Sequence, residues 1–216
     1  MRFRPWLVIV PVLLIATVVE GVPPEPDVDV THRAGITTTT PVTVFVYSTQ
    51  ADLSADDQET ALDVARDVLS TAFVKLVWAN CVPGTCLTPT PGALKIRIVQ
   101  SPGGSERDAH HLGQALINSQ TGSGELPTVF IDRTRRLAGE LGIDHRVLLG
   151  RTIAHELGHL LLATTTHGNA GLMREIWSRD ELLGARRADW VFDPHDADAI
   201  RQRLARRGNG RSRGAS

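Results

Sequence analysis

The chain has 216 residues, of which 42% are hydrophobic, and its formal net charge is −1. A chain of this length and composition can bury one sizeable core, so we expect a single domain. The near-zero charge and the sparse aromatic residues, with Tyr47 as the only tyrosine, argue against a basic or base-stacking surface that would bind nucleic acid.

The N-terminal residues predict an export signal. Arg2 and Arg4 precede an apolar run over residues 6–19, which Pro11 interrupts. As a helix, these fourteen residues would cover about 21 Å, which is less than the roughly 30 Å hydrocarbon core of a bilayer. We therefore expect residues 1–21 to be a signal peptide and the protein to be secreted or extracytoplasmic; if the segment is not cleaved, it is a membrane anchor.

A linker and then an alternation of strands and helices follow the signal segment. Residues 22–41 are rich in Pro, Thr and acids and predict a linker. Residues 42–47 alternate as a strand does, and Ser54 starts a helix whose apolar residues recur at helical spacing. Further strands are expected over residues 74–78, 94–98, 114–118 and 128–131.

Two cysteines enclose a short turn. Cys81 and Cys86 are separated by Val-Pro-Gly-Thr, in which Pro83-Gly84 supplies a turn that brings the two thiols together. In an oxidising compartment this pair predicts a local disulfide. The alternative, half of a zinc knuckle, lacks the second cysteine pair that such a site needs.

The C-terminal third predicts helices. Asp144 is placed to cap a long helix that should end near Ala163. Ser178 and Glu181 form a capping-box pattern for a short helix. Asp193-Pro194 opens a last helix, after which residues 208–216 are expected to be a disordered basic tail. The domain proper should then span residues 42–207.

The long helix carries a metal-binding pattern. His155 and His159 are four residues apart, so they project from one face of a helix and can hold a single Zn²⁺, with Glu156 beside them to act on a water molecule. The flanking residues are apolar nearly all round, which places the helix inside the domain: Val147, Leu148, Leu149, Ile153, Ala154, Leu157, Leu160, Leu161 and Leu162.

The third metal ligand is open from the residues alone. His167 is the first candidate, because the three threonines before it are poor helix formers and allow the chain to turn back toward the metal. Glu175 and Glu181 are the rivals, since a carboxylate on a following helix also completes such sites. Glu181 already has a role in the capping box.

The segment HELGHLLLATTTHGNAGLMREIW, residues 155–177, resembles the metzincin zinc proteases, whose signature is HExxHxxGxxH with a later methionine turn. It is more similar to a group of uncharacterised secreted bacterial proteins with HExGHLLLGxxxHxxxGIMRxxW. The looser resemblance covers residues 42–205. Two departures from the metzincin signature are visible: the third histidine lies two residues further on, and Leu162 and Ala163 stand where a helix-ending glycine is expected.

The resemblance implies a function and a ligand set. His155, His159 and His167 would be the zinc ligands, Glu156 the general base, and Met173 the floor of the site. The implied fold is an α+β, metzincin-like zincin domain. It would have a mixed twisted sheet of four to five strands, a backing helix, an active-site helix and a C-terminal helix.

We therefore expect a monomeric, secreted zinc metalloendopeptidase that acts on peptide or protein substrates. It would have no nucleic-acid partner, and a membrane partner only if the N-terminal segment remains. The alternative is a catalytically inactive, zinc-stabilised extracytoplasmic binding or structural protein. A third interpretation, a secreted binding domain in which the motif is accidental, would hold no zinc.

Overall fold

The structure is a computed structural model that describes residues 41–82, 84, 86, 88–89, 92–102, 111–118, 123–124, 126–184 and 186–213. The predicted signal peptide or anchor lies outside the described residues, as do all but the last residue of the predicted linker. All described residues belong to one unit, Thr38–Ser216.

A mixed five-stranded sheet has the order β2-β1-β3-β7-β4, which confirms the predicted class of sheet. The first four strands are parallel and β4 pairs antiparallel with β7 at the edge. The strand bounds are β1 Val42–Gln50, β2 Leu76–Cys81, β3 Leu94–Val99, β4 Gly113–Gln114 and β7 Thr128–Phe130. A separate two-stranded sheet pairs β5 Ile117–Asn118 with β6 Ser123–Gly124.

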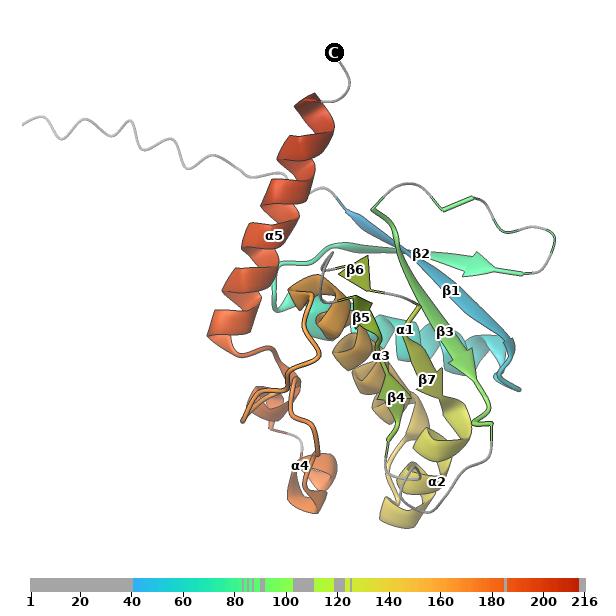
Figure 1. The fold of residues 1–216 in the computed structure, drawn as a ribbon. Helices are drawn as coiled ribbons and strands as arrows, with labels where there is room; N and C mark the ends of the chain where they lie inside the picture. The colour runs from blue at the N-terminus through green and yellow to red at the C-terminus, as the bar shows by residue number, and fades with distance from the viewer. Residues whose placement is uncertain are drawn as a thin grey trace, which may run out of the picture. The chain divides into compact units, whose positions relative to one another are not determined.

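Helices α1 and α3 cover one face of the sheet, and α5 lies against α3 at the left of the view (Figure 1). The helix bounds are α1 Ala55–Ser70, α2 Ile131–Leu141, α3 His145–Leu162, α4 Arg179–Leu183 and α5 Pro194–Arg213, with a 3₁₀ helix η2 at Arg187–Trp190. The domain is therefore α+β, with the backing, motif-bearing and C-terminal helices that the sequence predicts.

Strand β3 shows why the sheet has one core face. Leu94, Ile96 and Ile98 are buried against the helices, whereas Lys95 and Arg97 between them are exposed. Successive side chains of a strand point to opposite faces, so this alternation orients the whole strand. The buried residues join those of β1, α1 and α3 in one hydrophobic cluster.

Helices α1 and α3 approach closely at a glycine. A Cβ atom added to Gly150 of α3 would lie 2.5 Å from the carbonyl oxygen of Ala61 and 2.6 Å from the Cβ of Val64 in α1. Only a residue without a side chain fits there. The contact places α3 over the core face of the sheet. From Leu148 to Leu161, every residue of α3 except Arg151 is buried.

The sequence missed helix α2, because residues 128–131 were expected to be a strand with no helix before Asp144. The strand ends at Phe130, and α2 starts there without a side-chain N-cap, so the usual start signal is absent. Its end carries a signal: Gly142 adopts φ +68°, the left-handed conformation that commonly closes a helix. The predicted strand over residues 114–118 was also wrong in extent, since it divides into β4 and β5.

The C-terminal caps are as predicted, but the tail is not. Ser178 and Glu181 form a complete capping box at α4, and the Asp193 carboxylate accepts a hydrogen bond from the His195 amide at 2.8 Å. Helix α5 continues to Arg213, six residues into the segment that was expected to be a disordered tail.

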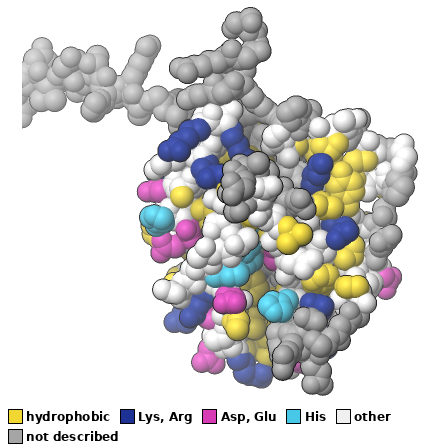
Figure 2. Space-filling view, viewed as in Figure 1, with side chains coloured by type: hydrophobic (Ala, Val, Ile, Leu, Met, Phe, Trp, Pro, Cys, Tyr) yellow, Lys and Arg dark blue, Asp and Glu magenta, His cyan; other side chains and the backbone are white. Residues whose placement is uncertain are grey.

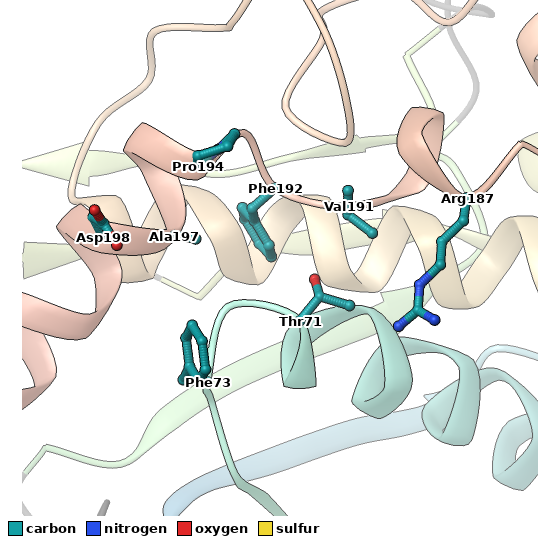
Figure 3. Close-up of a pocket in the computed structure, with 8 residues that line it drawn as sticks. All are labelled: Thr71, Phe73, Arg187, Val191, Phe192, Pro194, Ala197 and Asp198. Atoms are coloured by element: carbon teal, nitrogen blue, oxygen red, sulfur yellow. The ribbon is translucent and has the colours of Figure 1, made fainter. Parts of the chain in front are cut away.

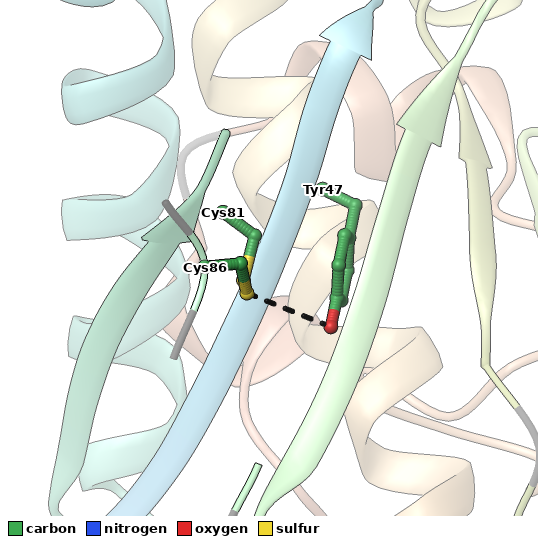
Figure 4. The surroundings of a disulfide bond; sticks show 3 residues. All are labelled: Tyr47, Cys81 and Cys86. Atoms are coloured by element: carbon green, nitrogen blue, oxygen red, sulfur yellow. Dashed lines mark hydrogen bonds between the residues drawn. A yellow bond between two sulfur atoms is a disulfide. The ribbon is translucent and has the colours of Figure 1, made fainter. Parts of the chain in front are cut away.

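A disulfide joins Cys81 and Cys86 at the end of β2, as the sequence predicts. Cys81 lies opposite Tyr47 in the parallel pairing of β1 with β2. The Tyr47 hydroxyl contacts Cys86 Sγ at 3.9 Å (Figure 4). The bridge therefore folds the chain back onto the sheet where the edge strand ends.

Across the described part of the chain, no helix is both long enough and apolar enough to cross a membrane.

Replacing the N-cap of α3 tests how the motif-bearing helix is anchored. Asp144 accepts hydrogen bonds from the Arg146 amide at 2.9 Å and from its guanidinium at 2.7 Å, and the latter bond lowers the Asp144 pKa to about 2. Asp144→Ala should lower the free energy of unfolding by about 1 kcal/mol, and Asp144→Asn by less, because Asn still caps. Chemical denaturation at pH 7 measures both.

The contribution of Asp144 to the free energy of unfolding should fall as the pH is lowered. Because the folded-state pKa of Asp144 is depressed, its contribution is complete above about pH 4 and is lost as the pH falls toward 2. The difference in unfolding free energy between the parent and Asp144→Ala should shrink over that range. A difference that stays constant from pH 6 to pH 2 would contradict this assignment.

Candidate metal centre

His155 and His159 lie one turn apart on α3, and each imidazole is oriented by a backbone carbonyl. His155 Nδ1 lies 2.8 Å from the Leu172 oxygen, and His159 Nδ1 lies 2.9 Å from the Thr164 oxygen. A carbonyl oxygen only accepts hydrogen bonds, so both Nδ1 atoms must carry the proton. The lone pair of each neutral ring is therefore on Nε2.

These two lone pairs point toward the same place. His155 Nε2 and His159 Nε2 are 3.1 Å apart, within the distance of a hydrogen bond, yet neither carries a proton to donate when Nδ1 does. Burial lowers the pKa of His155 to about 3 and lowers that of His159 as well, so neither ring gains the second proton that would bridge them. The two Nε2 lone pairs therefore repel each other, and a cation held between the two nitrogens would remove this repulsion.

The turn that follows α3 brings the third histidine to the same place. Ala163 ends the helix at φ +52°, so an alanine adopts the left-handed conformation that glycine usually provides. The Thr164 amide then donates a hydrogen bond to the His159 carbonyl at 3.2 Å, and the Thr164 carbonyl accepts one from His159 Nδ1. Further on, the Gly168 amide donates to the Met173 carbonyl at 2.8 Å, which closes the loop of residues 168–173 directly after His167.

His155, His159 and His167 form a cluster whose ligand nitrogens all lie within 4.8 Å of one another. The His167 ring stacks on that of His155, with centroids 5.3 Å apart, and meets the His159 ring edge-on at 4.8 Å. It is the most exposed of the three. Figure 2 shows histidine side chains near the middle of one face of the domain, beside hydrophobic side chains. The three residues could hold a metal ion.

Glu156 is buried next to this cluster without a partner for one of its oxygens. Its side chain is 4% exposed, and Oε2 makes no hydrogen bond within the described structure. Burial raises the pKa of Glu156 to about 8. A Cβ atom added to Gly113 of β4 would lie 2.4 Å from Glu156 Oε1, so the edge strand passes directly over the carboxylate.

An unpaired carboxylate oxygen in the interior is costly unless another group completes its environment. Glu156 Oε2 is such an oxygen, on the residue that directly follows His155 in α3. The three histidine donors are consistent with a metal ion.

Met173 packs beneath the motif helix. It is 1% exposed, and a Cβ atom added to Gly158 would lie 2.5 Å from its Sδ atom and 2.9 Å from the Phe192 ring. Gly158 lies directly before His159 on α3, so the methionine sulfur occupies the space that a side chain at this position would fill. Met173 thus packs against the α3 backbone next to His159.

The two rival ligands lie elsewhere. Glu175 is exposed and does not belong to the metal-binding cluster among the described residues. Glu181 accepts from the Ser178 amide and hydroxyl and pairs with Arg174; the bonds from Ser178, followed by that from Arg174, lower its pKa. Its pairing with Glu181 thus places the Arg174 side chain at the start of α4.

Several groups that shape the cluster were missed at the level of sequence. Leu172 and Thr164 act through their carbonyl oxygens, which no side-chain pattern reveals. Gly113 acts by having no side chain next to Glu156. Trp177 also lies at the cluster, because its ring meets that of His155 edge-on with centroids 5.6 Å apart. Its spacing from the histidines was the one available signal.

A separate hollow of about 320 Å³ lies between the end of α1 and the start of α5 (Figure 3). Its lining includes Phe73, Phe192 and Pro194, with Arg187 and Asp198 at opposite ends. None of the three histidines, nor Glu156, lines it. The hollow is thus distinct from the metal centre.

No protein-family model matches this chain, and no curated protein is significantly similar to it.

Metal content tests the ligand set. We expect the purified domain to hold about one transition-metal ion per chain. His155→Ala, His159→Ala and His167→Ala should each reduce that content strongly, because each removes a nitrogen donor. Glu175→Ala is the matched control and should leave it unchanged. Mass spectrometry of the metal in each purified variant provides the measurement; loss with Glu175→Ala but retention with His167→Ala would assign the third ligand to the glutamate.

The left-handed conformation of Ala163 can be tested by substitution. Ala163→Gly should raise the free energy of unfolding by up to about 1 kcal/mol, because relief of the strain at positive φ outweighs the greater freedom of glycine in the unfolded chain. Metal content should stay the same. Chemical denaturation of the metal-free protein measures the change, and a clear loss of stability would show that the alanine methyl group makes a favourable contact.

Proposed function

We propose that this protein is a zinc-dependent metallopeptidase that hydrolyses peptide bonds, with His155, His159 and His167 as ligands and Glu156 as the general base. The observation that carries the proposal is the meeting of two unprotonated Nε2 atoms at 3.1 Å beside a buried carboxylate with an orphaned oxygen. A purely structural histidine pair would not require the glutamate.

The chemistry of the donors favours zinc. Imidazole nitrogen suits Zn²⁺ as well as copper, iron and nickel, and three protein ligands with one open position are typical of catalytic zinc sites. With Zn–N distances of 2.0–2.1 Å, tetrahedral geometry separates two nitrogens by about 3.3 Å. The 3.1 Å between the first two histidines is close to this spacing.

The residues have distinct tasks in the proposed reaction. Zn²⁺, when bound, supplies a Lewis acid that polarises the scissile carbonyl and makes water a better nucleophile at neutral pH. Glu156 takes the proton from the attacking water and passes it to the leaving amine. Burial raises the Glu156 pKa toward the working pH, which suits a group that must both accept and return a proton, while a cation nearby opposes that shift.

Strand β4 supports a peptide as the substrate. It is the edge strand of the sheet, and at Gly113 its backbone lies against Glu156. An extended peptide can add to such an edge through backbone hydrogen bonds. That arrangement would hold a peptide bond near the carboxylate without depending on a particular side chain.

The proposal includes a metzincin-like fold and an extracytoplasmic location. A metzincin-like fold is supported by the motif, by the left-handed turn after α3 and by Met173 beneath Gly158. The disulfide supports an extracytoplasmic location, because such bonds persist in oxidising compartments.

One observation favours the alternative, a zinc-stabilised protein without catalysis. Glu156 is only 4% exposed and lies under the backbone of Gly113. If this covering persists, substrate would not reach the carboxylate. The following experiment separates the two functions.

Glu156→Gln should retain metal but lower the rate of hydrolysis by at least about 100-fold, because the amide cannot accept the proton. Cleavage of an unfolded protein substrate, with and without a chelator, measures the activity. Glu175→Gln, at an exposed glutamate in the following loop, is the matched control. If the Glu156→Gln variant cleaves as fast as the parent, the proposed mechanism is wrong. If the parent binds zinc but cleaves nothing, the non-catalytic alternative holds.

A further inference from the structure

Trp177 contacts the metal centre in two ways. Its indole Nε1 donates a hydrogen bond to the Leu172 carbonyl at 3.2 Å, and its ring lies edge-on to His155 at 5.6 Å with an interplanar angle of 89°. The same carbonyl oxygen accepts the His155 Nδ1 proton at 2.8 Å. One oxygen therefore joins the tryptophan to the first histidine of the motif.

The shared carbonyl gives the tryptophan control over the direction of the histidine. A carbonyl oxygen has two lone pairs, and here each has its own donor. The indole holds one lone pair and so fixes how the carbonyl is rotated. That rotation sets where the second lone pair meets His155, and hence where Nε2 points.

Trp177 is held in turn by Trp190, which a residue of α3 contacts. Its ring packs against Trp190 of η2, with centroids 5.1 Å apart, and the guanidinium of Arg151 lies 3.6 Å above the Trp190 ring. Arg151 and His155 are four residues apart on α3, so they share one face of the helix. Arg151, Trp190, Trp177 and His155 thus form a closed chain of contacts, which we call the aromatic brace.

Arg151 has no carboxylate partner in the described part of the chain, which distinguishes the aromatic brace from an ordinary surface ion pair. Burial lowers the pKa of Arg151 to about 10, so the group is still charged at neutral pH. A cation over the face of a tryptophan is attracted by the ring, and more strongly when both are partly desolvated. This contact fixes Trp190 against the helix that carries the ligands.

We propose that Trp177 is a positioning residue for the metal centre, which acts through the Leu172 carbonyl to aim His155, and that Arg151 and Trp190 hold it in place. The inference rests on the proposed metal site and extends it beyond the ligands. Partners that orient a ligating histidine typically change metal affinity by 10–100-fold when they are removed.

Trp177 also packs against both hydrophobic clusters of the domain, so a purely structural role must be separated from a positioning role. A packing role predicts a loss of stability in the metal-free protein and little else. A positioning role predicts weaker metal binding and a changed coordination geometry, even where the metal-free protein remains folded.

The test compares Trp177→Phe with the control Trp78→Phe. Phenylalanine keeps a ring but has no N–H donor. Trp78 is a half-buried tryptophan of β2 that packs against the main core. Three quantities are measured on the full domain: the zinc dissociation constant by competition with a chelating dye, the visible absorption of the cobalt-substituted protein, and the denaturation midpoint of the metal-free protein. Arg151→Gln is a second, milder variant that releases Trp190 and leaves both indoles.

We expect Trp177→Phe to weaken zinc binding by about 10-fold or more and to alter the cobalt spectrum, with Arg151→Gln changing both in the same direction by less. Trp78→Phe should change neither. Parental zinc affinity and cobalt spectra in both Trp177→Phe and Arg151→Gln would overturn the proposal while leaving the metal site intact. Absence of zinc binding by the parent would overturn the metal site itself, and the positioning role with it.

Discussion

Two backbone carbonyls, those of Leu172 and Thr164, decide what the motif helix can do. Each takes the Nδ1 proton of one histidine and so leaves both Nε2 lone pairs facing each other in a buried space. The helix alone places the two rings on one face, but it does not choose their tautomers or their rotation. The chain after α3 supplies both, and this explains why that segment folds back so tightly on the helix.

The arrangement would tie the proposed metal binding to the stability of the fold. A buried carboxylate and two opposed imidazole nitrogens are unfavourable without a cation, because none of these groups has a full set of partners. An ion that binds only the folded chain stabilises it by RT ln(1 + [L]/Kd). The domain is therefore expected to fold more firmly when metal is available, and the loop that carries His167 should gain most, since it is the most exposed part of the cluster.

Sequence predicted the parts of the structure that side-chain patterns encode. The caps at Ser54, Asp144 and Ser178 use local hydrogen bonds that a few neighbouring residues determine, and all three are present. Helical spacing places His155 and His159 on one face of α3, and His167, the first of three candidates for the third ligand, lies with them in the structure. Helix α2 was missed because it has no side-chain cap at its start, and the carbonyls that orient the histidines were missed because any residue can supply a carbonyl. Ala163 was identified as a departure from a glycine pattern, and the structure shows the alanine in the glycine conformation.

The disulfide has a consequence for β2, the edge of the sheet that lies opposite to β4. β2 is an edge strand, and Val77 on it is 49% exposed, so an unprotected β2 would offer both backbone groups and apolar surface to another chain. The bridge from Cys81 to Cys86 turns the chain back at the point where this edge would otherwise continue. The edge that another chain could pair with is therefore limited to the six residues of β2, and it lies across the sheet from β4, the strand against which Glu156 packs.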